Sequence, residues 1–169
     1  MMGDAARHRA SLCLGLLAAA LLAGGAGPER PSVKGGSPVA IGEYLVAIGG
    51  CNDCHTEGWN QNPGNVPIAQ RLTGSQVGWN GPWGTTYPTN LRLTVQKMTV
   101  EQWLQYLAVM QPRPPMPWFN MRAMSEPDQR AIYAYIRSLG PAGEPASEGL
   151  PPGEPPKTPY LVAAPRPPG

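Results

Sequence analysis

A chain of 169 residues with a formal net charge of +2 has room for one ordinary domain and lacks the basic excess typical of nucleic-acid-binding proteins. It contains 22 prolines, 21 glycines and a single phenylalanine, so it is short of the aromatic side chains that usually fill a core. We therefore expect a bound apolar group to occupy part of the interior.

Residues 1–27 have the layout of a secretory signal peptide, in which basic residues precede an uncharged apolar stretch and small residues follow it. The strongly apolar part, residues 11–23, is shorter than the roughly 20 residues that span a bilayer. Cys13 lies near the start of this stretch, whereas a lipoprotein carries its cysteine at the end. We expect export to the periplasm, with membrane association through an uncleaved segment as the alternative.

Residues 28–38 mix proline, glycine, serine and charge without an apolar period, which predicts a linker. One face of a helix follows, with the i, i+3, i+4, i+7 pattern at Ile41, Tyr44, Leu45 and Ile48. Gly49 and Gly50 end this helix directly before Cys51. Residues 56–88 carry many turn signals and no sustained period, so we expect mostly loop, organised by a bound group.

Two further helices are predicted in the second half of the chain. Thr99 and Gln102 form a capping box at the start of one, and Ser125 begins the other, which Gly140-Pro141 stops. Residues 141–169 are dominated by proline, which predicts an extended tail without a core of its own. The predicted fold is therefore all-α, with three main helices and long loops over residues 39–140.

The motif that carries chemistry is Cys51-Asn52-Asp53-Cys54-His55, the attachment sequence of c-type haem. Its spacing lets one backbone turn present both thiols to neighbouring vinyl groups and places the histidine at the iron. Structural zinc needs about four N or S ligands, and residues 28–169 contain only these two cysteines and this histidine. A thioredoxin-like dithiol is expected after a strand, whereas this motif follows a predicted helix. One covalent haem c is the favoured interpretation.

The second axial ligand is expected to be a methionine, because His8 leaves with the signal peptide and no further histidine exists. Met116 is favoured because the prolines around it, at positions 112, 114, 115 and 117, stiffen its loop. Met121 and then Met124 are the alternatives, since both lie before the last helix.

These features together resemble the class I c-type cytochromes over residues 39–140. The chain is similar to bacterial monohaem cytochromes and to cytochrome domains of dehydrogenase-associated subunits, through residues 84–91, 116–118 and 131–136. The resemblance implies the cytochrome c fold, in which His55 and Met116 form the axial pair. It also implies that the first and last helices cross, with Gly42 and Leu45 against Tyr135 and Ile136.

Several residues are candidates for the haem pocket. The side chains expected to shield the ring or to hydrogen-bond a propionate are Trp79, Trp83, Tyr87 and Asn90, with Arg71 as a propionate partner. A backbone carbonyl near Pro63 or Pro67 is expected to accept the second imidazole proton of His55. Relatives often carry an acidic residue where this chain has Arg92, and no calcium site is expected.

A six-coordinate iron leaves no open position for substrate, so the expected function is electron transfer rather than catalysis. The sequence contains no glycine-rich phosphate loop and no nucleophile paired with a base. The expected partners are a dehydrogenase as donor and an oxidase or another cytochrome as acceptor, with no nucleic acid. The alternative function is a ligand-binding or sensor haem protein whose sixth ligand can be displaced.

Overall fold

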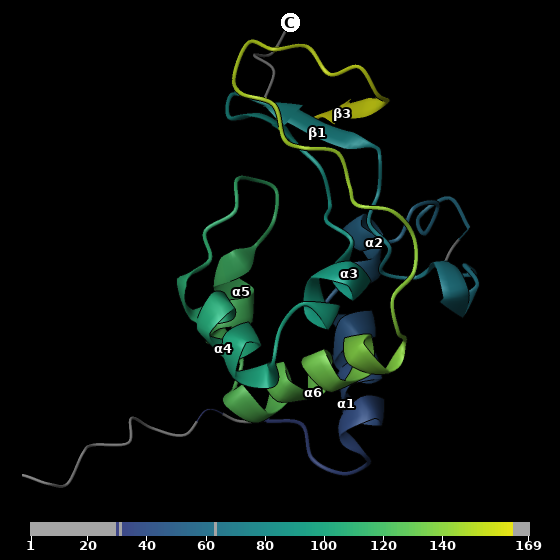
Figure 1. Cartoon of the computed structure of the whole chain (residues 1–169), viewed down its shortest axis with the longest axis vertical. Helices are drawn as coiled ribbons and strands as arrows, with labels where there is room; N and C mark the ends of the chain where they lie inside the picture. The colour runs from purple at the N-terminus through teal and green to yellow at the C-terminus, as the bar shows by residue number, and fades with distance from the viewer. Residues whose placement is uncertain (1–29, 31, 63, 164–169) are drawn as a thin grey trace, which may run out of the picture.

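A computed structural model describes residues 30, 32–62 and 64–163 of the chain (Figure 1). The expected signal peptide, residues 1–27, and Pro63 lie outside the described residues. Within them, no helix combines the length and apolar character that crossing a membrane requires.

Helix α1 (Pro38–Ile48) crosses α6 (Glu126–Ser138) at the end of the molecule away from the sheet, as Figure 1 shows. Ser37 caps α1 and Ser125 caps α6, each accepting from a backbone N–H of the first turn. The helices approach closely at Gly42, where an added Cβ would lie 2.0 Å from the carbonyl oxygen of Ala131. The predicted contact between Gly42 and Tyr135 is confirmed, because that Cβ would lie 2.7 Å from the Cβ of Tyr135.

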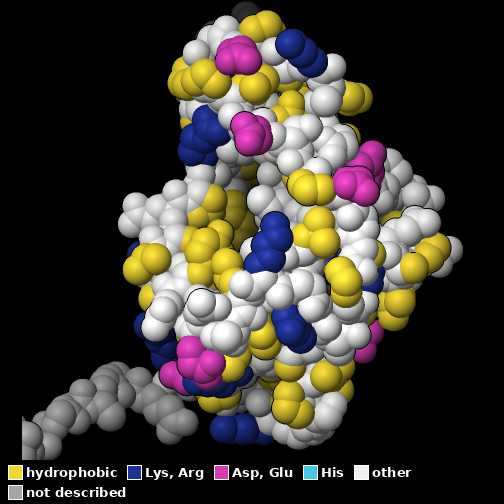
Figure 2. Space-filling model, in the orientation of Figure 1, with side chains coloured by type: hydrophobic (Ala, Val, Ile, Leu, Met, Phe, Trp, Pro, Cys, Tyr) yellow, Lys and Arg dark blue, Asp and Glu magenta, His cyan; other side chains and the backbone are white. Residues whose placement is uncertain are grey.

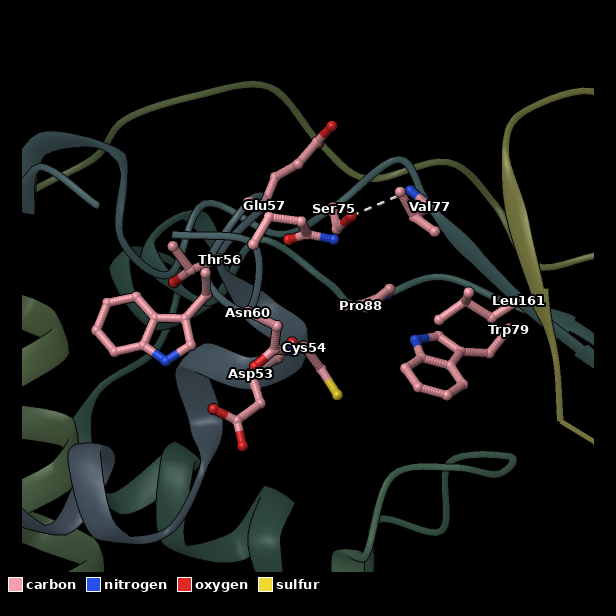
Figure 3. A pocket seen from close by; sticks show the side chains of 13 residues that line it. Asp53, Cys54, Thr56, Glu57, Asn60, Ser75, Val77, Trp79, Pro88 and Leu161 are labelled. Atoms are coloured by element: carbon pink, nitrogen blue, oxygen red, sulfur yellow. Dashed lines mark hydrogen bonds between the residues drawn. The ribbon is translucent and has the colours of Figure 1, made fainter. Parts of the chain in front are cut away.

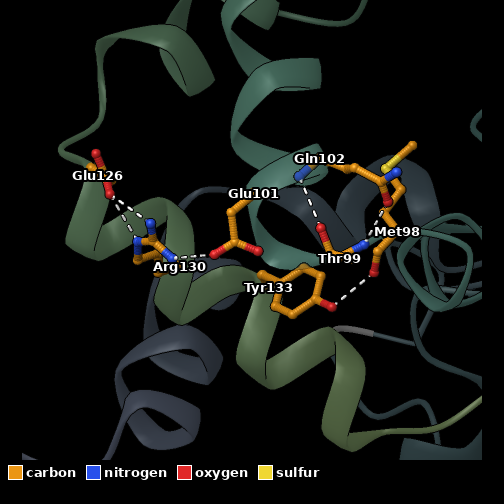
Figure 4. Close-up of polar contacts among 7 residues, drawn as sticks. All are labelled: Met98, Thr99, Glu101, Gln102, Glu126, Arg130 and Tyr133. Atoms are coloured by element: carbon orange, nitrogen blue, oxygen red, sulfur yellow. Dashed lines mark hydrogen bonds and ion pairs between the residues drawn. The ribbon is translucent and has the colours of Figure 1, made fainter.

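The predicted middle helix is α4 (Val100–Val109), and its capping box is present. The Thr99 hydroxyl accepts from the Gln102 N–H, and the Gln102 side chain accepts from the Thr99 N–H (Figure 4). The indole N–H of Trp103 donates to the Gln129 carbonyl of α6 at 3.0 Å. On the surface, Arg130 of α6 pairs with Glu101 of α4 at 3.5 Å. These contacts fix α4 against α6.

Three short helices were not predicted: α2 (Cys51–His55), α3 (Leu91–Gln96) and α5 (Trp118–Ala123). Helices of five or six residues are too short to show an apolar period. In Figure 1, α4 and α5 form a lobe beside the remainder of the domain. Side chains from most of these elements share one hydrophobic core, which includes Leu45, Val46, Leu72, Val95, Trp103, Leu107, Met121, Ile132, Tyr135 and Ile136.

The all-α prediction is wrong, because the chain also forms a three-stranded sheet of order β2-β1-β3. Strands β1 (Gly78–Gly81) and β2 (Gly84–Thr86) form an antiparallel hairpin inside the predicted loop region, which also holds the 3-10 helix Ile68–Gln70. Strand β3 (Tyr160–Val162) runs parallel to β1. With three or four residues each, these strands are too short for the alternation that identifies strands in a sequence.

The C-terminal segment, residues 141–163, contains no helix and lies along the domain from α6 to β1, where it supplies β3 (Figure 1). The Asn90 amide donates to the Ala142 carbonyl at 2.8 Å, and Leu150 exchanges two backbone hydrogen bonds with Thr85. The predicted linker is also attached, since the Val33 N–H donates to the Asp128 carboxylate at 3.0 Å. Both ends of the described chain are therefore tied to the domain.

Candidate functional site

The five-residue motif forms one short helix, α2, that begins where α1 ends. Gly50 takes the left-handed conformation, with φ of +66°, which turns the chain from α1 into α2 and which glycine adopts without steric cost. Cys51 and Cys54 are free thiols, each half-buried. One helical turn thus presents two unpaired thiols and the following histidine, as the attachment sequence requires.

Both thiols are protonated at neutral pH. Burial is the main cause that raises the pKa of Cys51 to about 11, and the nearby carboxylate of Asp53 adds to it. The pKa of Cys54 is also raised, first by burial and then by Asp53. Catalytic cysteines of dithiol oxidoreductases have lowered thiol pKa values. The electrostatics of this site therefore disfavour the thioredoxin-like alternative.

The His55 imidazole is buried, with 9% of its surface exposed, and is oriented by the backbone. Its Nδ1 lies 2.8 Å from the carbonyl oxygen of Thr89. Because a carbonyl only accepts, Nδ1 carries the proton and the lone pair of Nε2 is left for a metal. Burial lowers the pKa of His55, and the hydrogen bond to Thr89 partly opposes this effect. The imidazole is therefore neutral, as a metal ligand must be.

The prediction that a carbonyl near Pro63 or Pro67 would accept the His55 proton is wrong. The acceptor, Thr89, is 34 residues after His55 and directly precedes Asn90, the N-cap of α3. Helix α3 is anchored by Arg92, which was not among the predicted site residues. The Arg92 guanidinium is 5% exposed and donates to the carbonyls of Ala69, Leu139 and Gly140, which ties α3 to the C-terminal end of α6.

A cavity lies beside Cys54 and is shared by distant parts of the chain (Figure 3). The Cys54 sulfur and the Trp79 indole of β1 point toward one another across this space, and Leu161 of β3 and Pro88 complete the wall. Trp79 was a predicted pocket residue, whereas Leu161 was missed because it belongs to the predicted tail. The space-filling view also shows a hollow with hydrophobic walls between the lobe of α4 and α5 and the rest of the molecule (Figure 2).

The other predicted pocket residues differ in what their polar atoms do. The indole N–H of Trp83 is buried and has no hydrogen-bond partner among the described residues. Tyr87 bonds to the Thr158 hydroxyl at 2.9 Å. The Asn90 amide group donates to the carbonyls of Ala142 and Glu144, and its oxygen caps α3. Of these three residues, only Trp83 has a buried polar atom without a partner among the described residues. The haem-pocket roles of Trp83, Tyr87 and Asn90 stay predictions.

The predicted propionate partner, Arg71, is held by contacts within the protein. Its Nε donates to the Val66 carbonyl at 2.9 Å, and its guanidinium lies 5.3 Å above the ring of Trp59. The guanidinium also faces the Tyr135 hydroxyl of α6, where its charge and a hydrogen bond oppose the rise in the pKa of that phenol. A propionate contact of Arg71 stays a prediction.

The three candidate methionines all pack against the same hydrophobic core. Met121 is the most deeply buried, at 8% exposed, while Met116 and Met124 are half-buried. The loop of Met116 is distinguished by its attachment to the β1-β2 hairpin. Arg113 donates to the Trp83 carbonyl at 2.9 Å, and the Thr86 hydroxyl donates to the Pro114 carbonyl at 2.7 Å. The assignment of Met116 as axial ligand stays a prediction.

The residues present fit a covalently attached haem in three respects. The two thiols are unpaired, the imidazole has one nitrogen free, and a buried indole N–H lacks a partner. Among the described residues, no group of three or more His, Cys, Asp or Glu side chains is placed to hold a metal ion. That finding gives the zinc alternative no support.

Comparisons with protein-family models, with curated proteins and with solved structures yield no match. The functional inference therefore depends on the motif and on the geometry of this chain.

Proposed function

We propose that this chain is a periplasmic electron carrier that binds one haem c through Cys51, Cys54 and His55. The observation that carries the proposal is the single turn of α2, which presents two free thiols beside an imidazole whose Nδ1 is engaged by Thr89. A bound haem supplies reversible one-electron exchange at its iron. The fold is proposed to be a cytochrome c fold to which a small sheet has been added.

His55 is held for this task by its surroundings. The hydrogen bond from Nδ1 to the Thr89 carbonyl fixes the tautomer and the ring orientation, and it makes Nε2 a better electron donor. Burial of the ring keeps water from competing for the same position. Cys51 and Cys54 would form thioether bonds, which keep the cofactor in place when the iron changes its oxidation state.

Met116 is proposed as the second axial ligand and Trp83 as a donor to a propionate. A thioether ligand favours ferrous over ferric iron and so a relatively high reduction potential. Two protein ligands leave no position for substrate, which makes the chain a carrier and not an enzyme. We propose a dehydrogenase as donor and an oxidase or another cytochrome as acceptor, in the compartment to which residues 1–27 would direct the chain.

The proposal is tested by absorption spectra of the oxidised and reduced protein beside Met116→Ala, Met121→Ala and Met124→Ala. Wild type should show the weak near-infrared band of sulfur-to-ferric-iron charge transfer, and Met116→Ala alone should lose it. Loss in Met121→Ala instead would reassign the ligand. If wild type lacks the band and its reduced form binds carbon monoxide readily, the carrier function is wrong and the sensor alternative replaces it.

A further inference from the structure

The loop that carries Met116 has few hydrogen bonds of its own. Four of its residues are prolines, which have no backbone N–H to donate. Among the described residues, no backbone N–H from position 111 to 117 donates a backbone hydrogen bond. The position of this loop therefore depends on side chains that attach it to other parts of the protein.

Arg113 is the main attachment, and it reaches two other segments at once. Its guanidinium donates to the Trp83 carbonyl at 2.9 Å and to the Leu150 carbonyl at 2.8 Å, with a weaker contact to the Thr85 carbonyl at 3.3 Å. The first and third acceptors belong to the β1-β2 hairpin, and the second belongs to the C-terminal segment. One side chain thus joins three segments that are far apart in the sequence.

The C-terminal segment is shaped to meet Arg113. At Gly149 an added Cβ would lie 2.3 Å from Nη2 of Arg113 and 2.9 Å from the Thr85 carbonyl oxygen, so a larger residue would displace the guanidinium from this place. At Gly84, with φ of +94°, an added Cβ would lie 2.2 Å from the Leu150 carbonyl oxygen. Leu150 and Thr85 also exchange backbone hydrogen bonds of 2.9 and 3.0 Å. Two glycines therefore let the hairpin and the C-terminal segment approach each other and the guanidinium of Arg113, which is an exposed residue.

We propose that Arg113 is a positioning residue through which the C-terminal segment holds the Met116 loop in place. The C-terminal segment holds the Arg113 side chain in position, and Arg113 holds the Met116 loop in position. Release of the segment therefore weakens the bond between the Met116 sulfur and the iron. The statement about iron rests on the proposed function, whereas the mechanical link between segment and loop does not. An arginine suits this role because its planar fork can serve several carbonyls, which a lysine ammonium does less well.

The link is tested from both sides in the full chain, with Arg113→Gln on the loop and Gly149→Val on the segment. Amide hydrogen exchange is measured at Leu150, which reports the segment, and at Trp118, whose N–H donates to the Met116 carbonyl and reports the loop. Both variants should speed exchange at both amides by about tenfold or more. The control is Arg137→Gln, which removes a guanidinium from the backbone carbonyl of Gln96 on another face.

Faster exchange at Leu150 in Gly149→Val with an unchanged rate at Trp118 would overturn the link. In haem-loaded protein, both variants should also weaken the near-infrared band and bind carbon monoxide faster when reduced, with Arg113→Lys in between. An unchanged band with faster exchange would overturn the connection to the iron. The proposed function fails if the chain keeps no haem after denaturation. That outcome does not affect the exchange result, which tests the link between the segment and the loop.

Discussion

Gly42 offers a direct test of the crossing of α1 and α6, through the substitution Gly42→Ala. The added Cβ would lie 2.0 Å from the Ala131 carbonyl oxygen and 2.6 Å from its carbon, both backbone atoms that cannot rotate away. Ordinary contact begins at 3.4 Å, so α1 and α6 must separate by roughly 1.4 Å. Such overpacking costs about 3 kcal/mol. Alanine recovers about 1 kcal/mol of helix propensity, and the net loss is about 2 kcal/mol.

This loss is measured by urea unfolding followed by far-ultraviolet circular dichroism. With an m value of about 2 kcal/mol/M, the midpoint should fall by about 1 M. The matched control is Ala47→Gly on the exposed face of α1, which should cost only about 0.5–1 kcal/mol through propensity. If propensity governed both sites, Gly42→Ala would be more stable than wild type, and that result would refute the close crossing.

Further substitutions test the supports of the site. Arg92→Met should lower the free energy of unfolding by about 2–3 kcal/mol, because buried carbonyls lose their donor; a change below about 0.5 kcal/mol would contradict the role given to Arg92. Thr56→Val should cost about 1–3 kcal/mol in urea unfolding, since the buried Leu72 N–H loses its acceptor, and an unchanged midpoint would argue against it. Thr99→Ala should cost about 1 kcal/mol in thermal unfolding through loss of the capping box, with Gln105→Ala at an exposed position of the same helix as a comparison. Burial raises the pKa of Tyr135 from 10.0, with Glu43 adding to the shift and Arg71 and Arg92 opposing it, so the unfolded chain ionises first. Stability should therefore fall as the pH rises above about 10, and Tyr135→Phe should reduce that fall; an identical slope in both proteins would contradict the burial of the phenol.

The helices that the sequence predicted are those with strong end signals. The capping box at Thr99 and the serine before α6 mark helices long enough to show an apolar face. The crossing of α1 and α6 was expected only through the resemblance, and the structure confirms it at Gly42. Local signals of this kind act within a few residues, which is why they can be read from one sequence.

What could not be predicted depends on pairing between distant residues. Strand β1 of the hairpin pairs with β3, which is about 80 residues later in the chain. Residues near the hairpin in the sequence give no sign of this pairing. The acceptor for His55 and the carbonyls around Arg92 are likewise brought together by the fold. One usable signal was overlooked, since asparagine is a typical helix N-cap and α3 begins directly after Asn90.

The central claim is that Cys51 and Cys54 hold one haem covalently, and the intact mass of the denatured protein tests it most directly. The full chain is produced in a host that attaches haem and is then unfolded in acid. Its intact mass is measured by mass spectrometry beside that of the Cys51→Ser/Cys54→Ser double variant. The account predicts that wild type retains the mass of one haem and that the double variant retains none. A wild-type mass equal to the polypeptide alone, with free thiols or with an internal disulfide, would contradict it.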